Sequence, residues 1–225
     1  MVESANLRAL FFYGPLETNW IGHQMAEIFR DGVYKPYMPL GKEGKLALDI
    51  GANIGLASIY FSNFFDQVIS LEPSEEHFDA LKRNMESNLI TNVKPIKKAI
   101  YIKNGQFPFG GLPTNRTMRS LHMGVWNGGQ PSETVDCVTL DTLFDQEKIE
   151  HVDFMKLDIE GSETELISSE GFSAIASKID TIMGEYYNWS GRNPHQIVDA
   201  FHLNGFSYKT IETLQSSSIF LATKI

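Results

Sequence analysis

Short apolar runs alternate with helical patterns along the chain from Lys45 onward, which is typical of βαβ units and a parallel sheet. Residues 45–51, KLALDIG, are almost continuously apolar, as expected for a strand buried on both faces. Residues 54–65 follow as a helix that is apolar nearly all round, and residues 67–73, QVISLEP, as a second strand. We therefore predict a mostly parallel sheet with helices on both faces.

The next helix is expected after Ser74, which can cap it, with Glu75 and Glu76 in the favourable first turn. Its apolar face is predicted from four residues at helical spacing, Phe78, Leu81, Met85 and Leu89. Residues 93–102, VKPIKKAIYI, are predicted to form a third strand.

Residues 103–134 interrupt this rhythm with nine glycines and prolines. The segment is predicted to be an irregular loop or a hairpin. Loops of this length inside compact domains are uncommon and are often lids or binding loops, whereas the composition alone equally fits a poorly ordered excursion. Residues 133–144 then indicate an extended segment that enters a short helix.

The strand rhythm resumes at residues 151–161, and Ser162 with Glu165 predicts a capping box for the next short helix. Another strand is expected at 180–189. Asn193 and Pro194 predict a helix start and Gly205 its end. Residues 206–213 and 217–225 are strand-like with no room for a helix between them, so this pair must be antiparallel. The fold class is thus α/β, a Rossmann-like sheet of seven strands, mostly parallel with an antiparallel C-terminal pair.

The first 44 residues lack clean periodicity, but their seven aromatic residues suggest that they pack on the domain: Phe11, Phe12, Tyr13, Trp20, Phe29, Tyr34 and Tyr37. We predict a cap over residues 1–44 and one domain over residues 45–225, in which 103–134 is a candidate lid. No internal repeat or clear domain boundary is visible.

Composition excludes some functions. The 225 residues are 42% hydrophobic and 21% charged, as in an ordinary folded domain. The single Cys137 permits no internal disulfide or multi-cysteine metal site, so a reducing, cytoplasmic location is expected. A net charge of -9 argues against nucleic acid as a partner. No secretion signal and no apolar run long enough to span a membrane is apparent.

The most informative short motif is Asp49-Ile50-Gly51-Ala52-Asn53-Ile54-Gly55, which lies where a predicted strand meets a helix. Ligands bind at the carboxyl ends of strands in open parallel sheets, so this is the position of a cofactor turn. Gly51 permits a sharp turn and Gly55 a close approach. The glycine spacing departs from the G-x-G-x-x-G of nicotinamide-binding proteins. Asp49 also suits a cationic amino-acid headgroup better than a pyrophosphate.

Glu72 ends the second strand, where a carboxylate can accept the hydroxyls of an adenosine ribose. With both elements, the chain resembles the class I S-adenosylmethionine-dependent methyltransferases over residues 45–225. The resemblance implies that the methionine part of the cofactor is held by the first motif and the ribose by Glu72. Residues near the adenine would be Lys98 and Ala99, and Ser74 is a further cofactor-binding candidate. On this basis the cofactor-binding set is Asp49, Gly51, Asn53, Gly55, Glu72, Ser74, Ala99 and Asp158.

A second dense motif covers residues 154–163, FMKLDIEGSE. Lys156, Asp158 and Glu160 lie on one side if the strand continues to Glu160, and three unpaired charges on one face favour a site over a purely structural sheet. This motif, about a hundred residues after the first, resembles that of the FkbM-type methyltransferases. The resemblance implies O-methylation of hydroxyls on natural products, sugars or glycolipids. It places Asp158 near the transferable methyl and the cofactor amino group, with Glu160 and Lys156 shaping the acceptor site.

Transfer to a hydroxyl needs a base, and Asp158 or Glu160 is the candidate, with Lys156 completing the catalytic set. The two carboxylates could instead hold a divalent cation, although no further ligands can be identified. Glu185 is a third acidic candidate at the pocket rim. His122, beside Arg116 and Arg119, is a candidate substrate contact, whereas His77 and His195 are predicted on the surface.

The acceptor is the least defined part of the hypothesis. We expect a small-molecule or carbohydrate acceptor, neutral or cationic, selected by residues 1–44 and 103–134. Three aromatics there, Phe107, Phe109 and Trp126, could stack on a sugar or could equally anchor the loop. The competing interpretations are a nicotinamide oxidoreductase on a related sheet and a cofactor-binding scaffold that has lost catalysis.

Overall fold

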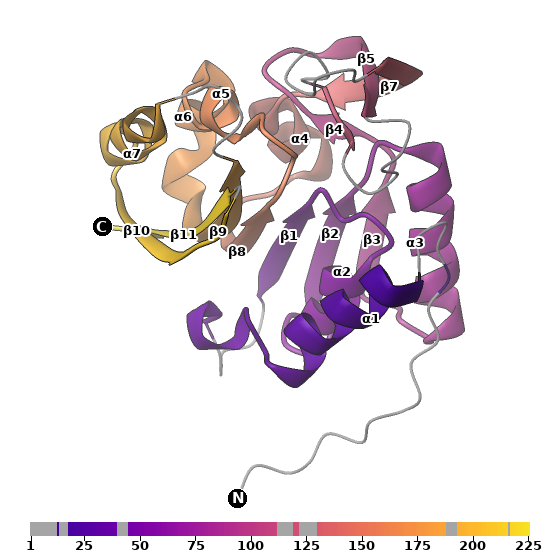
Figure 1. Cartoon of the computed structure of the whole chain (residues 1–225). Helices are drawn as coiled ribbons and strands as arrows, with labels where there is room; N and C mark the ends of the chain where they lie inside the picture. Colours follow the sequence, from indigo (N-terminus) through magenta and orange to yellow (C-terminus); the bar gives the residue numbers. More distant parts are fainter. Residues whose placement is uncertain are drawn as a thin grey trace, which may run out of the picture.

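The computed structural model describes residues 13, 18–39, 45–111, 119–121, 130–187, 193–215 and 217–225. Seven strands form the main sheet in the order β10-β11-β9-β8-β1-β2-β3 (Figure 1). Their bounds are β1 Leu46–Ile50, β2 Gln67–Leu71, β3 Val93–Ile96, β8 Val152–Leu157, β9 Ile179–Tyr187, β10 Phe206–Thr213 and β11 Ser217–Lys224. The five strands from β3 to β9 are parallel, and β11 runs antiparallel to both β9 and β10. The predicted fold class is confirmed.

The register of the central strands decides which side chains share a face. Asp49 pairs with Ser70 of β2 on one side and with Lys156 of β8 on the other, and Lys156 pairs in turn with Met183 of β9. Neighbouring residues of a strand point to opposite faces, so these four side chains lie on one face. Charged groups of β1 and β8 are therefore adjacent in the middle of the sheet.

One face of the sheet is covered by N-terminal segments of the chain. These are α1 Thr18–Met25, the π-helical turn η1 Ala26–Arg30, the 3-10 turn η2 Lys35–Tyr37, α2 Leu56–Phe61 and α3 Glu75–Ser87. Ile28 and Met38 are buried among residues of α2 and of the sheet, including Phe61 and Phe154. Residues 18–39 thus pack on the same face as Asp49 and Lys156.

The opposite face carries the larger apolar core, beneath helices from the C-terminal half. These are α4 Leu140–Glu147, α5 Glu163–Ile167, α6 Glu170–Ile175, the 3-10 turn η4 Ala176–Lys178 and α7 Pro194–Leu203. Helix α7 begins as predicted, because the Asn193 side chain accepts a hydrogen bond from His195 N at 3.0 Å. No helix in the described part of the chain has the length and apolar content that a membrane crossing would require.

A second, four-stranded sheet has the order β4-β7-β5-β6. Its strands are β4 Ala99–Ile100, β5 Gly105–Gly111, β6 Arg119–Ser120 and β7 Gln130–Val138. It lies beyond the arrowheads of β1, β2 and β3 (Figure 1). The predicted single strand over residues 93–102 is therefore wrong, because Lys97 and Lys98 separate β3 from β4, which pairs with β7 in the other sheet. Of the two alternatives for residues 103–134, the described part forms the hairpin.

Helix boundaries and faces depart from expectation in three places. The helix predicted over residues 54–65 is shorter, since the turn at Gly55 delays its start to Leu56. Leu89 lies beyond α3 with positive φ and is 76% exposed, so it takes no part in the buried face. His77 was expected on the surface, but it is buried beside Glu72.

Candidate functional site

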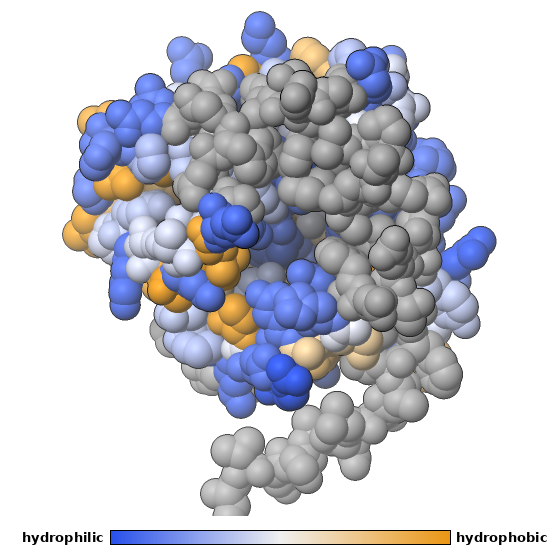
Figure 2. Space-filling model, in the orientation of Figure 1, coloured by the Kyte–Doolittle hydropathy of each residue, from blue (hydrophilic) through white to orange (hydrophobic). Residues whose placement is uncertain are grey.

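A cavity of about 450 Å³ opens at the carboxyl ends of β1, β2, β8 and β9. Figure 2 shows the molecule hollowed near the middle of this face, with a hydrophilic surface inside the hollow. Residues of both sequence motifs line the cavity, together with residues of β9, of the small sheet and of the segment 18–39. Asp49 and Gly55 of the first motif are not among the lining residues. Its volume is in the range of small-molecule and cofactor sites.

The turn after β1 is shaped by residues with positive φ. Gly51 has φ +81°, and a Cβ built on it would lie 1.8 Å from the backbone oxygen of Asp158. Gly55 has φ +87°, and a Cβ there would lie 2.8 Å from Cε of Met85 in α3. Only glycine fits both positions without strain, because the chain must turn sharply while two other segments press against it. Asn53 also has positive φ, at 52°.

Asp49 is fully buried at the base of this turn. Its Oδ2 accepts a hydrogen bond from Oγ of Ser58 at 2.5 Å, and Ser58 is linked in turn to Oγ of Ser70 at 2.7 Å. Its Oδ1 has no hydrogen-bond partner among the described residues, although the Lys156 ammonium lies 3.4 Å away. The carboxylate is therefore held in place and keeps one oxygen available.

Lys156 is the cation at the centre of the cavity wall. Its Nζ donates to the backbone oxygen of Gly51 at 3.0 Å and lies 3.7 Å from Oδ2 of Asp158. Burial lowers the pKa of Lys156, but the carboxylates of Asp49 and Asp158 outweigh burial and raise it above its ordinary value. The ammonium stays charged and joins the two sequence motifs.

Glu72 is buried at the end of β2, and backbone groups fix both of its oxygens. Oε2 accepts from Asn53 N at 2.8 Å and Oε1 from Ser74 N at 2.9 Å, while Nδ1 of His77 lies 3.9 Å from Oε1. Burial raises the pKa of Glu72 to about 7 in spite of these two donors. Each carboxylate oxygen can accept more than one hydrogen bond, so both remain able to accept a hydroxyl.

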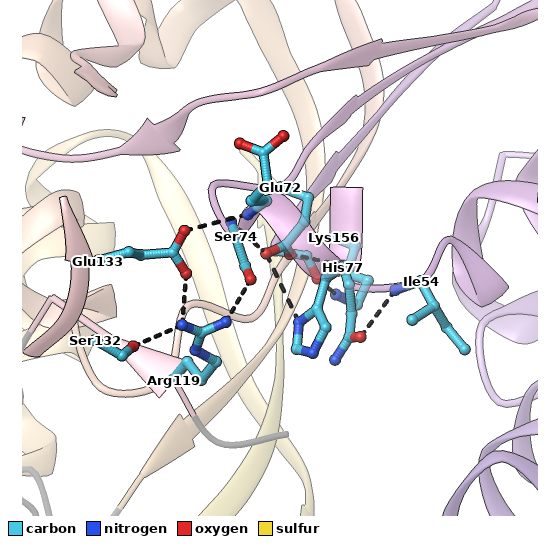
Figure 3. Close-up of polar contacts among 11 residues, drawn as sticks. Ile54, Glu72, Ser74, His77, Arg119, Ser132, Glu133 and Lys156 are labelled. Atoms are coloured by element: carbon cyan, nitrogen blue, oxygen red, sulfur yellow. Dashed lines mark hydrogen bonds and ion pairs between the residues drawn. The ribbon is translucent and has the colours of Figure 1, made fainter. Parts of the chain in front are cut away.

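Arg119, on the small sheet, contacts Ser74, two residues after Glu72 (Figure 3). Its guanidinium donates to Oγ of Ser74, to Oγ of Ser132 at 2.6 Å and to the carboxylate of Glu133. It also lies over the ring of Phe109, 5.3 Å from the centroid. Sequence reasoning named Arg119 only as a neighbour of His122. The other residues expected near an adenine, Lys98 and Ala99, line this same end of the cavity.

The loop after β8 carries the second motif. The strand ends at Leu157, so the condition that it continues to Glu160 is not met. Glu160 has φ +56° and Gly161 φ +100°, a left-handed turn in place of extended backbone. Lys156, Asp158 and Glu160 nevertheless line one cavity, because the turn folds the loop back over the end of the sheet.

Asp158 and Glu160 differ in how their oxygens are used. Oδ1 of Asp158 accepts a hydrogen bond from the Tyr187 hydroxyl at 3.2 Å. Oε2 of Glu160 is buried, and nothing in the described part of the chain hydrogen-bonds to it. Burial, followed by the charge of Asp158, raises the pKa of Glu160 well above its ordinary value. Glu160 is thus a carboxylate with a raised pKa and one buried oxygen that no described residue engages.

The predicted capping box of Ser162 and Glu165 is wrong. Ser162 occupies the N-cap of α5 without a side-chain cap bond, and its buried Oγ has no hydrogen-bond partner within the described segments. Glu163 stabilises the loop instead, since its Oε1 accepts from Ile159 N at 3.0 Å and from Gly161 N at 3.1 Å. Burial raises the pKa of Glu163 to about 8. The acidic residue two positions after Gly161 was the signal that could have revealed this role.

Strand β9 contributes two further side chains on the face of Lys156, Glu185 and Tyr187. Burial raises the pKa of Glu185 to about 7, and it also raises the pKa of Tyr187. The Tyr187 hydroxyl interacts with Glu160 and Glu185 as well as with Asp158. Sequence reasoning found Glu185 and missed Tyr187, although the two are separated by the two-residue period of a strand.

The segment 18–39 closes the cavity from the other side. Gln24, Glu27, Val33 and Tyr34 line it opposite Asp158 and Glu185. Burial raises the pKa of Tyr34 and of Glu27. This part of the wall is therefore mixed in character, with two weakly acidic groups beside an apolar side chain.

The remaining candidates fall into two groups. Phe109 lines the cavity and Phe107 packs on Tyr101, whereas Arg116, His122 and Trp126 lie outside the described residues. His195 is exposed, as predicted.

Asp158 and Glu160 were the alternative ligands for a divalent cation, and the described residues place no third His, Cys, Asp or Glu ligand atom close enough to share an ion with them. In the described ranges, only one group of three His, Cys, Asp or Glu side chains is close enough to share an ion. It consists of His151, Asp153 and Asp180, away from the cavity.

Comparison with solved structures places this fold among methyltransferases. A methyltransferase FkbM from Methylobacillus flagellatus KT matches with a TM-score of 0.55 at 15% identity, over 86% of this chain and 46% of that one. The T. thermophilus 16S rRNA N2 G1207 methyltransferase, solved with AdoMet and guanosine, matches with a TM-score of 0.50 at 10% identity, over 87% and 42% of the two chains. At these identities the likeness concerns the fold alone.

The family model described as the methyltransferase FkbM domain matches residues 49–208. The chain therefore belongs to the FkbM methyltransferase family. Among curated proteins it is 28% identical to methyltransferase sdnD of Sordaria araneosa over 174 residues, which is 63% of this chain. The match spans 65% of the length of that relative.

Proposed function

We propose that the protein is an S-adenosylmethionine-dependent methyltransferase that methylates a hydroxyl group of a small molecule, sugar, glycolipid or natural product. The observation that carries this proposal is the meeting of two motifs in one cavity. The carboxylate of Glu72, which suits a ribose, lies at one end of the cavity. The carboxylate of Glu160, whose Oε2 has no hydrogen-bond partner among the described residues, lies at the other. The family membership and the fold support the same activity.

The residues present fit this cofactor. Glu72 would accept the two ribose hydroxyls, since both of its oxygens keep acceptor capacity. The carboxylate of Asp158 would face the cationic amino group, and that of Asp49, paired with Lys156, would add negative charge behind it. The close packing at Gly51 shapes the backbone that would hold the methionine part. Ala99 and Phe109 offer apolar surface at the adenine end.

When bound, S-adenosylmethionine supplies an electrophilic methyl carbon and a sulfur that leaves with the electrons of the broken carbon–sulfur bond. The chain must bring an acceptor oxygen to roughly 3 Å from that carbon and take its proton. We assign Glu160 as the base that takes this proton, because its Oε2 is buried without a partner among the described residues and its pKa is raised. Asp158, held by Tyr187 and facing Lys156, would orient the cofactor.

The acceptor end favours neutral or cationic molecules. Glu27, Asp158, Glu160 and Glu185 line it, and the ammonium of Lys156 is engaged with Gly51, Asp49 and Asp158. An anionic acceptor would add repulsion at this end, whereas hydroxyl or amino groups would supply the donors that the carboxylates need.

Calorimetry with S-adenosylmethionine, S-adenosylhomocysteine and NAD tests the cofactor. We expect the first two to bind, and Glu72→Gln to weaken both while the exposed control Glu86→Gln does not. A panel of hydroxyl compounds, followed by detection of S-adenosylhomocysteine, tests the reaction. Binding of NAD in place of the sulfur compounds, or cofactor binding with no turnover on the whole panel, would count against the proposal.

A further inference from the structure

Two contacts tie the small sheet to the first turn of α3. The guanidinium of Arg119 in β6 donates to Oγ of Ser74, the N-cap residue of that helix. Glu133 of β7, which also accepts from Arg119, accepts a hydrogen bond from Glu75 N at 3.2 Å through its other oxygen. Figure 3 shows these groups in one continuous network. The side chain of Arg119 is 15% exposed, so its bond to Ser74 is partly buried, whereas the bond from Glu75 N to Glu133 is exposed.

The network leads to the carboxylate of Glu72 without Arg119 touching it. The same Ser74 that binds Arg119 through its hydroxyl donates its backbone N–H to Oε1 of Glu72. Oε2 of Glu72 is held by Asn53 of the first motif. The position of the Glu72 carboxylate therefore depends on Ser74, which the hydrogen bond from Arg119 holds in place.

Arg119 also acts on Glu72 by its charge. Burial raises the pKa of Glu72 to about 7, while the positive charges of Arg119 on β6 and Lys156 on β8 lower it. His77 of α3 lies on the remaining side, 3.9 Å away. Removal of the guanidinium charge would leave the carboxyl protonated to a higher pH.

The small sheet supplies the wall at this end of the cavity. Ile100, Phe109, Arg119 and Leu121 line it beside Glu72 and His77. We expected residues 103–134 to select the acceptor, but their described part lies at the end opposite Glu185 and Tyr187. The small sheet thus covers the place where a nucleoside would bind.

We propose that Arg119 is a positioning residue for an adenosine-containing ligand, fastening the small sheet over the turn that carries Glu72. The inference rests on the proposed function, since it takes S-adenosylmethionine as the physiological ligand. The acceptor is then selected elsewhere, by residues 18–39 and β9.

The test compares Arg119→Gln, Arg119→Lys and the exposed control Arg83→Gln, which lies on α3 away from the network. Binding of S-adenosylhomocysteine and of adenosine alone is measured by calorimetry across pH 6 to 9. Hydrogen exchange over residues 105–111 and 130–138 is followed with and without S-adenosylhomocysteine. Circular dichroism establishes that each variant is folded.

For Arg119→Gln we expect binding of both probes to weaken about tenfold or more at pH 7, since charge-assisted hydrogen bonds are lost. The pH midpoint for binding should rise, because Glu72 must be ionised to accept two hydroxyls. Arg119→Lys keeps the charge but cannot bridge three acceptors, so the midpoint should stay and the affinity should be intermediate. Ligand-induced protection of the small sheet should be lost in both variants.

The outcomes separate the two proposals. If the unmodified protein binds neither probe, the proposed function fails. If it binds both and Arg119→Gln matches Arg83→Gln in affinity, pH midpoint and exchange, the role of Arg119 is overturned while the cofactor proposal stands. If Arg119→Gln does not fold, Arg119→Lys decides alone: unmodified affinity and protection in that variant would overturn the role.

Discussion

The two ends of the cavity satisfy their buried carboxylates in different ways. At the Glu72 end, each oxygen receives a backbone N–H, and the surrounding turn is fastened by Arg119. At the Glu160 end, Oε2 of Glu160 and Oγ of Ser162 are buried without hydrogen-bond partners in the described ranges. The protein alone supplies hydrogen bonds to both oxygens of Glu72, whereas the buried polar atoms at the Glu160 end need a ligand.

This difference indicates that the two ends of the cavity have different roles. Leaving a polar atom buried and unpaired costs about 1–3 kcal/mol. Such costs persist where a bound molecule or a reaction recovers them. The Glu72 end is therefore suited to binding the cofactor, and the Glu160 end to the reaction on the acceptor.

Glu160→Gln should give the largest effect. We expect turnover to fall about 10²–10⁴-fold, the usual contribution of a positioned base, with binding of S-adenosylhomocysteine little changed. Turnover of the unmodified protein should rise with pH through the raised pKa of Glu160, since the base must be deprotonated, and this limb should be missing in the variant. Asp158→Asn should lose less turnover and more cofactor affinity. Unchanged turnover in both variants would exclude carboxylate catalysis at this end.

Gly51→Ala should damage both ends together. A Cβ there would lie 1.8 Å from the backbone oxygen of Asp158, at a φ that alanine rarely adopts. We expect a loss of about 3 kcal/mol of unfolding free energy and about a hundredfold weaker binding of S-adenosylhomocysteine. Gly22→Ala is the matched control, since nothing lies within 4 Å of its added methyl. Thermal unfolding and calorimetry measure the two effects. Equal behaviour of the two variants would show that the turn tolerates the shift.

Glu163→Gln should change the pH dependence of stability. The folded pKa of about 8 exceeds the ordinary value of 4.5, so folding favours the neutral acid. This contribution is fully present below about pH 4.5 and is lost as the pH rises to about 8, by on the order of 3 kcal/mol. Glutamine keeps the oxygen that accepts from Ile159 and Gly161. Denaturant unfolding at pH 5 and pH 8 should therefore differ less in this variant than in the exposed control Glu150→Gln.

Tyr187→Phe should have the smallest effect and the most selective one. It removes the hydroxyl that donates to Asp158 at 3.2 Å. Turnover should fall about tenfold because the same hydroxyl also interacts with Glu160, the proposed base. Affinity for S-adenosylhomocysteine should stay within a factor of two, because Asp158 keeps its contact with Lys156. Tyr186→Phe, on the opposite face of β9, is the control for turnover. A larger change in affinity than in turnover would assign Tyr187 to the cofactor end.

The sequence predicted what depends on local pattern. The sheet, the antiparallel end and the Asn193 cap all followed from periodicity and turn residues. Both motifs lie at predicted strand ends, and residues of both meet in one cavity. Parallel strands bring their carboxyl ends to one edge, so motifs at strand ends meet there.

What the sequence did not predict depends on partners distant along the chain. His77 was expected at the surface because it lies in a polar first turn, and it is buried by its contact with Glu72. Lys97 and Lys98 looked like strand residues, but the pairing of Ala99 with Cys137 moves β4 into another sheet. Tyr187 and Arg119 gain their roles only through neighbours on other strands.

The pairing of β1 with β8 has a consequence for the order in which the molecule can form. Residues 46–50 dock against residues 152–157, with Gly51 packed on Asp158, so the site joins segments a hundred positions apart. Contacts of such high sequence separation close late and slow folding. A nascent chain that ends before β8 lacks one wall of the cavity. Ligand binding should therefore report completion of the sheet, and S-adenosylhomocysteine should slow unfolding more than it speeds refolding.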